Sequence, residues 1–215
     1  MSPPVPNRSS RAALVLAALA ASLVIDPGYA DPGAATAAPG AGTRLAAAKF
    51  TESGELVRPD DLDEWVFLGA SLGLGYDEAK RAPGDPGDFQ VVLMEPSAYA
   101  YFKAHGAYAD GSMFLLSFYF TAQRMSTGQA GFAQGDLKNF EIHLIERERF
   151  AEGRAFYLFS KEGGHAAALP AGNPCVECHL RDGAFDGTFA QFYPALRYRI
   201  PSEQLHKSLR NDARH

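Results

Sequence analysis

The sequence predicts an α+β domain built on an antiparallel β-sheet, with short helices flanking it. Four segments in the middle of the chain have the length and the apolar or aromatic content of strands. The turns between them are too short for the crossover connections that parallel strands require. Helical signals stand before, between and after these segments. The expected strands are 89–95, 112–122, 139–146 and 154–160, and the expected helices are 59–66, 96–105 and part of 186–199.

Start and stop signals define the first elements. Residues 59–66 open with a proline followed by acidic side chains, which is typical of a helix N-terminus. The apolar run 89–95 predicts a strand. Pro96 then opens a short helix that ends at Gly106, because proline is favoured at the first helical position and glycine after the last one.

The elements between residues 110 and 146 are predicted from turn residues and from the pattern of polar and apolar side chains. Asp110-Gly111 is a turn signal, and 112–122 is long, apolar and aromatic enough for a well-buried strand. The Gly- and Gln-rich stretch 124–136 predicts a loop. Residues 139–146 alternate in polarity, so successive side chains face opposite sides of the sheet. One side takes Phe140, Ile142 and Leu144, and the other takes Glu141 and His143.

The chain is organised as one domain between flanking segments. Residues 1–30 have the pattern of a secretory signal peptide, with positive side chains before an uncharged apolar run and small residues at the cleavage position. A membrane span needs about 20 apolar residues; the run has 14, so we expect a cleaved signal, a periplasmic protein and no membrane span in the mature chain. An uncleaved N-terminal anchor is the alternative. The stretch 31–45 predicts a flexible linker, 46–202 the folded domain and 203–215 a polar tail.

Composition and charge exclude several classes of protein. Of the 215 residues, 47% are hydrophobic and 21% are charged, which excludes collagen, a coiled coil and a fully disordered chain. The net charge of −5 argues against a nucleic-acid partner, because phosphate binding depends on Lys and Arg. The two cysteines are too few for a disulfide-rich scaffold.

Both cysteines lie in one string, Cys175-Val-Glu-Cys178-His179, which is the C-x-x-C-H signature of c-type haem attachment. The two thiols would add across the two vinyl groups of haem, and the two-residue spacer matches the distance between these groups. His179 follows directly and is placed to bind the iron as the proximal ligand. We therefore predict one covalently attached haem c, held by Cys175 and Cys178, with His179 as the metal ligand.

Other interpretations of this string are weaker. A structural zinc site needs four ligands, and the chain has no second cysteine pair. A thioredoxin-like redox motif would need a βαβ pattern nearby, whereas 165–174 resembles a loop. A disulfide between Cys175 and Cys178 would be strained.

The chain resembles the cytochrome P-460 family, which includes the sheet-type cytochromes c-prime. The resemblance runs from about Phe50 to Arg197. It rests on four stretches in the family's order. These are FTESGELVRPDDLDEWVFLG, MEPSAYAYFKAHGAYADGS, GFAQGDLKNFE, and CVECH closing on FAQFYPALR.

The resemblance implies a sheet-based fold, often a homodimer, with one pentacoordinate haem. His179 would hold one face of the iron and leave the other open to nitric oxide, carbon monoxide or hydroxylamine. In the hydroxylamine-oxidising members a lysine on the central strand is bonded to the porphyrin edge, and the matching position here is Leu116. A lysine cross-link is therefore not expected. Glu141 matches the family's distal carboxylate, and Gln90 stands where cross-linked members have an arginine.

Strand alternation extends the predicted haem pocket. It places Phe114, Leu116, Phe118 and Phe120 on one face of the strand 112–122. If Leu116 faces the haem, Phe114 and Leu116 form an apolar cofactor-binding wall that favours weakly polar diatomic ligands. Sheet core is the alternative role for Phe114. For Phe118 and Phe120 it is the role we expect.

Polar and sulfur side chains supply further candidates. Glu141 is the catalytic candidate, because a carboxylate above an open iron can accept a proton when an N–H or O–H ligand is oxidised; a solvated glutamate is the alternative. His143 shares its face, and we expect a surface histidine rather than part of a proton relay. Met94, Met113 and Met125 are candidates for a sixth iron ligand, although methionine more often packs in a core.

Two functions follow, from different classes. The first is a binding protein for nitric oxide or carbon monoxide, indicated by Leu116 and the aromatic strand. The second is an oxidoreductase acting on hydroxylamine or a related nitrogen compound, indicated by Glu141 and the resemblance. Both imply a redox partner protein, and the sequence leaves open whether the protein is an enzyme.

Overall fold

The computed structural model describes residues 45, 48–75, 82–123, 131–203 and 205, all within the unit 36–215. The predicted signal peptide, nearly all of the predicted linker and most of the predicted tail lie outside the described residues. Within the described part of the chain, no helix has the length and apolar character needed to cross a membrane.

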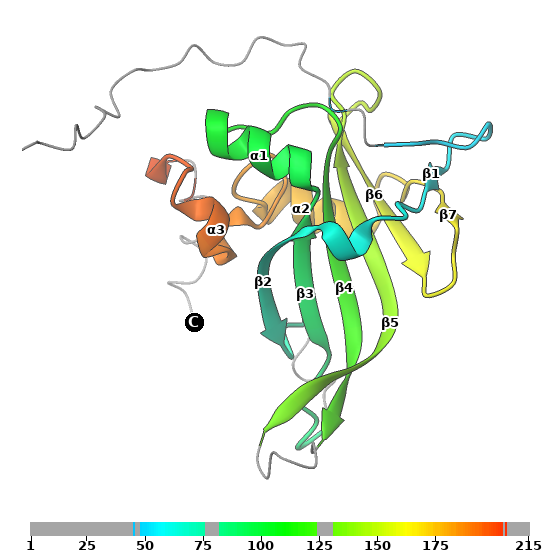
Figure 1. The fold of residues 1–215 in the computed structure, drawn as a ribbon, viewed down its shortest axis with the longest axis vertical. Helices are drawn as coiled ribbons and strands as arrows, with labels where there is room; N and C mark the ends of the chain where they lie inside the picture. The colour runs from blue at the N-terminus through cyan, green and yellow to red at the C-terminus, as the bar shows by residue number, and fades with distance from the viewer. Residues whose placement is uncertain (1–44, 46–47, 76–81, 124–130, 204, 206–215) are drawn as a thin grey trace, which may run out of the picture. The chain divides into compact units, whose positions relative to one another are not determined.

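A five-stranded antiparallel sheet forms the centre of the described domain, with the strand order β2-β3-β4-β5-β6 (Figure 1). Each strand therefore pairs with its neighbour in the sequence, as in a meander. The short strands β1 (Leu56–Val57) and β7 (His165–Ala166) form a separate two-stranded sheet. The central strands are β2 (Val66–Leu72), β3 (Phe89–Met94), β4 (Ser112–Gln123), β5 (Phe132–Ile145) and β6 (Arg154–Ser160).

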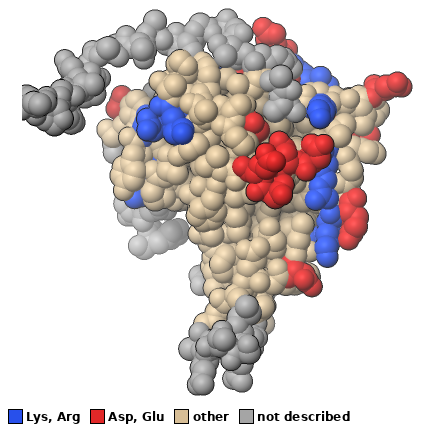
Figure 2. Space-filling model, viewed as in Figure 1, with Lys and Arg blue, Asp and Glu red and all other residues tan. Residues whose placement is uncertain are grey.

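Short helices gather around one end of this sheet (Figure 1). In α1 (Pro96–His105), the carboxylate of Glu95 accepts hydrogen bonds from the backbone N–H groups of the first turn, and Gly106 ends the helix in the left-handed conformation. The others are α2 (Pro174–Asp182) and α3 (Pro194–Arg197), with the 3₁₀ turns η1 (Leu62–Glu64) and η3 (Ala190–Phe192). Figure 2 shows acidic side chains gathered over η1, whose first turn contains Asp63 and Glu64.

The two faces of the sheet have different roles. Met113, Leu115 and Ile142 belong to one buried cluster. Phe114 points to the other face, where it shares a second cluster with Phe102 of α1, Leu196 of α3 and other residues. The helices therefore cover this second face at one end of the strands.

The predicted α+β fold is confirmed, and the strands 89–94, 112–123 and 154–160 agree with expectation within a residue. The short strands β1 and β7 were not expected, and three larger elements differ. The helix expected over 59–66 is a single 3₁₀ turn followed by β2, a strand that the sequence did not indicate. β5 begins at Phe132, inside the expected loop, because its first residues pair with the far end of β4. The motif segment, to which we assigned no element from the sequence, is the helix α2.

Candidate functional site

The C-x-x-C-H string occupies the first turns of α2, where one side chain fixes the helix start. The side chain of Asn173 accepts a hydrogen bond from the backbone N–H of Cys175, 2.9 Å away, and Pro174 takes the first helical position. Positions three and four residues apart share one face of a helix, so Cys175, Cys178 and His179 project from the same side. Both cysteines are free thiols and half-buried.

His179 is held in one orientation by a backbone carbonyl. Its Nδ1 lies 2.7 Å from the carbonyl oxygen of Gly187, and since a carbonyl only accepts, Nδ1 carries the proton. Nε2 is therefore left with a free lone pair, which is the form that binds a metal. Burial lowers the pKa of His179, although the hydrogen bond to Gly187 opposes this shift, so the ring is neutral at neutral pH.

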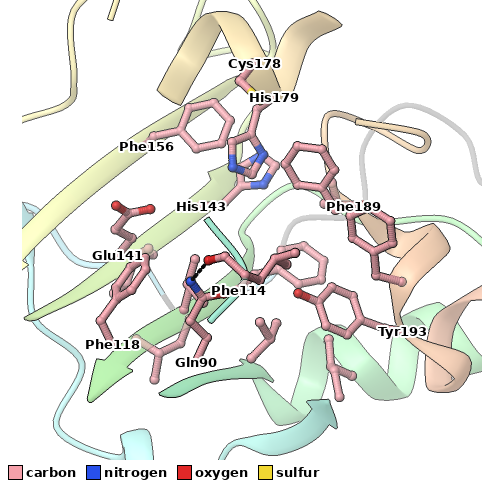
Figure 3. Close-up of a pocket in the computed structure, with 18 of the residues that line it drawn as sticks. Gln90, Phe114, Phe118, Glu141, His143, Phe156, Cys178, His179, Phe189 and Tyr193 are labelled. Atoms are coloured by element: carbon pink, nitrogen blue, oxygen red, sulfur yellow. Dashed lines mark hydrogen bonds between the residues drawn. The ribbon is translucent and has the colours of Figure 1, made fainter. Parts of the chain in front are cut away.

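Beside His179 lies a cavity of about 250 Å³ between α2, the helix-covered face of the sheet and the segment from Thr188 to Leu196 (Figure 3). His179 and Cys178 line it from the helix side. Its walls are mostly apolar, and aromatic rings are common among them. The aromatic lining residues are Phe114, Phe118, Phe156, Phe189, Phe192 and Tyr193.

Strand β4 contributes the predicted wall. Phe114, Leu116 and Phe118 all line the cavity, and Phe114 is buried. For Phe118 the expectation of a role in the sheet core was wrong, because this residue faces the cavity. Phe120 does not belong to a core either; its side chain is 56% exposed and lies against the ammonium group of Lys138. Register irregularities after Phe118 interrupt the pairing with β5 at this point.

Glu141 on β5 also lines the cavity, directly across from Leu116 in the β4–β5 pairing. Figure 3 shows its carboxylate on the same side of the strand as His143. Burial raises the pKa of Glu141, which favours the protonated carboxyl group. The carboxylate also contributes, after burial, to the raised pKa of the Cys175 thiol. The structure therefore brings the candidate carboxylate to the motif.

His143 is buried, so the expectation of a surface histidine was wrong. Its ring stacks on Phe156 at 4.3 Å between ring centres and lies 5.7 Å from the ring of His179. Its Nε2 is buried and has no hydrogen-bond partner among the described residues, and the side chain lines the cavity. Burial, reinforced by His179 and Arg154, holds the pKa of His143 well below its usual value. The alternation in the sequence placed His143 on the same face as Glu141. The packing of α2 against the sheet buries His143 on that face.

The methionines do not provide a ligand from the described residues. Met94 and Met113 are almost completely buried in the two cores, and neither lines the cavity. Met125 lies outside the described residues. Gln90 does line the cavity, but its amide is engaged: Nε2 donates to the carbonyl oxygen of Leu74 at 2.7 Å, and Oε1 accepts from Ser71 at 3.0 Å.

Two neighbours of His179 were missed by sequence reasoning. Phe156 of β6 and Phe189 lie 4.6 and 4.7 Å from its ring centre. Phe189 stands in the stretch FAQFYPALR that carried the resemblance, which was the available signal. Phe156 belongs to a predicted strand, but no local pattern indicated that its face meets α2.

The side chains present fit a haem. They provide two thiols and a histidine with a free Nε2 on one helix face, beside an apolar cavity with aromatic walls. The lone pair of Nε2 is the donor that haem iron takes from a proximal histidine. A closed zinc centre is not supported, because no three His, Cys, Asp or Glu side chains of the described residues converge as metal ligands would.

Comparison with known proteins agrees with this site. A comparison with curated proteins gives no match. The family model described as Cytochrome P460 matches residues 59–190, which is more than half of the chain and extends from η1 through the motif to η3. That family implies a haem cofactor, as the donor set does. The chain belongs to the cytochrome P460 family.

Proposed function

We propose that the protein is an exported, mono-haem c-type cytochrome whose iron keeps one face open for small ligands such as nitric oxide or carbon monoxide. The observation that carries this proposal is the pairing of His179, with its free Nε2, and a cavity whose β4 wall has no iron-binding side chain. In this proposal Cys175 and Cys178 form the thioether bonds and His179 binds the iron. When bound, the haem supplies an iron that exchanges one electron and takes up a small ligand.

The lining of the cavity supports selection for small, weakly polar ligands. Phe114, Leu116 and Phe118 offer no hydrogen-bond donor and narrow the space available. On β3, the Gln90 amide is held in place, because Nε2 donates one hydrogen bond to Leu74 and Oε1 accepts one from Ser71. A diatomic molecule needs no hydrogen bond to bind ferrous iron. A polar ligand that enters an apolar cavity loses its hydrogen bonds to water, and this loss weakens its binding.

The proposal also covers the location, the redox partner and the assembly of the protein. Covalent attachment prevents haem loss, which suits a periplasmic protein with a cleaved signal peptide. A redox partner protein supplies or removes the electron, and a homodimer is the assembly that we expect.

An absorption spectrum of the holoprotein tests the proposal. The protein is produced in a host with c-haem maturation and measured oxidised, reduced, and reduced with carbon monoxide. We expect a high-spin reduced spectrum that shifts when carbon monoxide binds. The variant Cys175→Ser/Cys178→Ser should lose covalent haem, which is read after extraction under denaturing conditions. A reduced protein that is six-coordinate and inert to carbon monoxide would overturn the open site.

Glu141 supports a second candidate, an oxidoreductase that oxidises hydroxylamine or a related small nitrogen compound. The raised pKa of this carboxyl group brings it nearer to the range useful for proton transfer at the cavity. The test is turnover with an electron acceptor, compared between wild type, Glu141→Gln and the matched control Glu148→Gln, whose side chain is exposed. Turnover lost only in Glu141→Gln supports this candidate; no turnover above free haem rejects it. A strongly red-shifted reduced Soret band would indicate a porphyrin cross-link and favour this candidate.

A further inference from the structure

We propose that Asp186 is a positioning residue for the axial histidine, acting through the carbonyl of Gly187. The proposal deepens the proposed function, because it rests on His179 as the iron ligand. The segment after α2 turns back at Gly183, and its Gly187 carbonyl oxygen comes to 2.7 Å from Nδ1 of His179. Asp186 immediately precedes that carbonyl.

Asp186 joins this turn to two arginines at the ends of β5 and β6. One carboxylate oxygen lies 2.6 Å from an Nη atom of Arg147, and the other lies 3.4 Å from an Nη atom of Arg154. Arg147 is itself tied to Asp110 at 2.7 Å, at the start of β4. The carboxylate of Asp186 therefore connects the turn that holds His179 to the central sheet.

The backbone is shaped for this connection. Among the described non-glycine residues, Asp186 alone has a positive φ, 51°, a conformation that Asp and Asn tolerate better than other side chains. The guanidinium of Arg154 packs directly against Gly187, where an added Cβ would displace it. On the other side, a Cβ on Gly183 would lie 2.5 Å from the carbonyl carbon of Gly187. The carbonyl that holds His179 is thus confined between α2 and Arg154.

The contacts of Asp186 and Gly187 have two effects on His179 as an iron ligand, and both lower the midpoint potential. A hydrogen bond from Nδ1–H to a fixed acceptor raises the basicity of the ligating Nε2. The carboxylate of Asp186 also compensates the charge of Arg154, whose guanidinium lies 3.4 Å from that carboxylate and packs against Gly187. Both effects favour the ferric state, because ferric iron carries the greater positive charge.

The test compares holoproteins of wild type, Asp186→Asn and Asp88→Asn. Asparagine keeps the shape and tolerates the positive φ, but it removes the charge that holds both arginines. Asp88→Asn is the matched control, because it breaks another partly exposed ion pair, Asp88–Lys138 at 2.8 Å, and neither of its members lines the cavity. We expect the iron–histidine stretching band of the reduced protein to fall in resonance Raman spectra of Asp186→Asn. We also expect its midpoint potential to rise, with neither change in the control.

A second variant separates the effect of the position of the Gly187 carbonyl from the effect of the charge of Asp186. Arg154→Gln removes the group that packs on Gly187 together with one positive charge. We expect it to lower the iron–histidine band, as Asp186→Asn does, but to raise the potential less than Asp186→Asn. An iron–histidine band unchanged in both variants overturns the proposal, and so does a potential shift in Asp186→Asn without a band shift. Failure of the proposed function is visible separately, as a wild-type protein without covalent haem or carbon monoxide binding.

Discussion

The partly buried carboxyl group of Glu141 gives a prediction that does not depend on catalysis. Burial raises the pKa of Glu141 above the ordinary glutamate value of 4.5, so the folded protein binds this proton more tightly than the unfolded chain does. The contribution of Glu141 to stability is therefore complete below pH 4.5 and is lost as the pH rises through the folded pKa. Haem in the cavity would displace water from the carboxyl group and increase the shift.

The size of the effect follows from proton linkage. Between the unfolded and the folded pKa, a difference of one bound proton lowers the free energy of unfolding by at most about 1.4 kcal/mol for each pH unit. Glu141→Gln is uncharged at every pH and removes this slope. We therefore expect the stability of wild type, relative to Glu141→Gln, to fall as the pH rises above 4.5 and then to level off.

The assay is urea denaturation of the holoproteins at a series of pH values from about 4 to 8, a range that contains the ordinary glutamate pKa. Glu148→Gln is the control, because its exposed side chain lies just beyond β5 and outside the cavity. We expect the difference between wild type and this control to be nearly independent of pH. A wild-type curve parallel to that of Glu141→Gln over the whole range would show that the carboxyl group is not buried in the cavity.

Three further predictions concern the same site. Asn173→Ala removes the acceptor for the Cys175 N–H and should lower the free energy of unfolding by about 1 kcal/mol, as measured by urea denaturation; an unchanged midpoint would contradict the cap. Phe114→Ala truncates a ring that is 6% exposed and packs on Tyr108 at 4.9 Å, and it should cost about 3–5 kcal/mol in the same assay, whereas a loss below about 1 kcal/mol would mean the ring is not part of the core. Met94→Leu and Met113→Leu should leave the oxidised and reduced absorption spectra unchanged, and a change in either spectrum would identify a sulfur ligand.

The strands that could be predicted are those whose pattern is local. β6 is bounded by turn residues and reads as an uninterrupted apolar and aromatic run, so its limits follow from the sequence. β2 could not be predicted, because Gly69 and a register shift beside it break the strand pattern. The reason for that glycine is a long-range contact: a Cβ there would lie 2.8 Å from the Tyr193 ring.

The residues of the site also fall into those that a local pattern predicts and those that depend on tertiary packing. Cys175, Cys178 and His179 form a local motif, and their placement on one helix face follows from its spacing. The burial of His143 and the ring contacts of His179 depend on how α2 packs against the sheet. A strand pattern shows that two residues share a face, but it does not show whether another element covers that face.

The alternation of β4 explains why one strand can serve both stability and function. Met113 and Leu115 belong to one buried core cluster, whereas Phe114 and Leu116 belong to the other face, which lies toward the cavity. Substitutions at Met113 or Leu115 therefore act mainly on folding, because both side chains are almost completely buried in that cluster. A substitution at Leu116 changes the cavity wall beside Glu141, its partner in the β4–β5 pairing, and leaves the cluster around Met113 unchanged. The chemistry of the pocket can thus vary along one face of β4 without loss of the fold, and position 116 is where the resemblance places the difference between lysine-bearing members of the family and this chain.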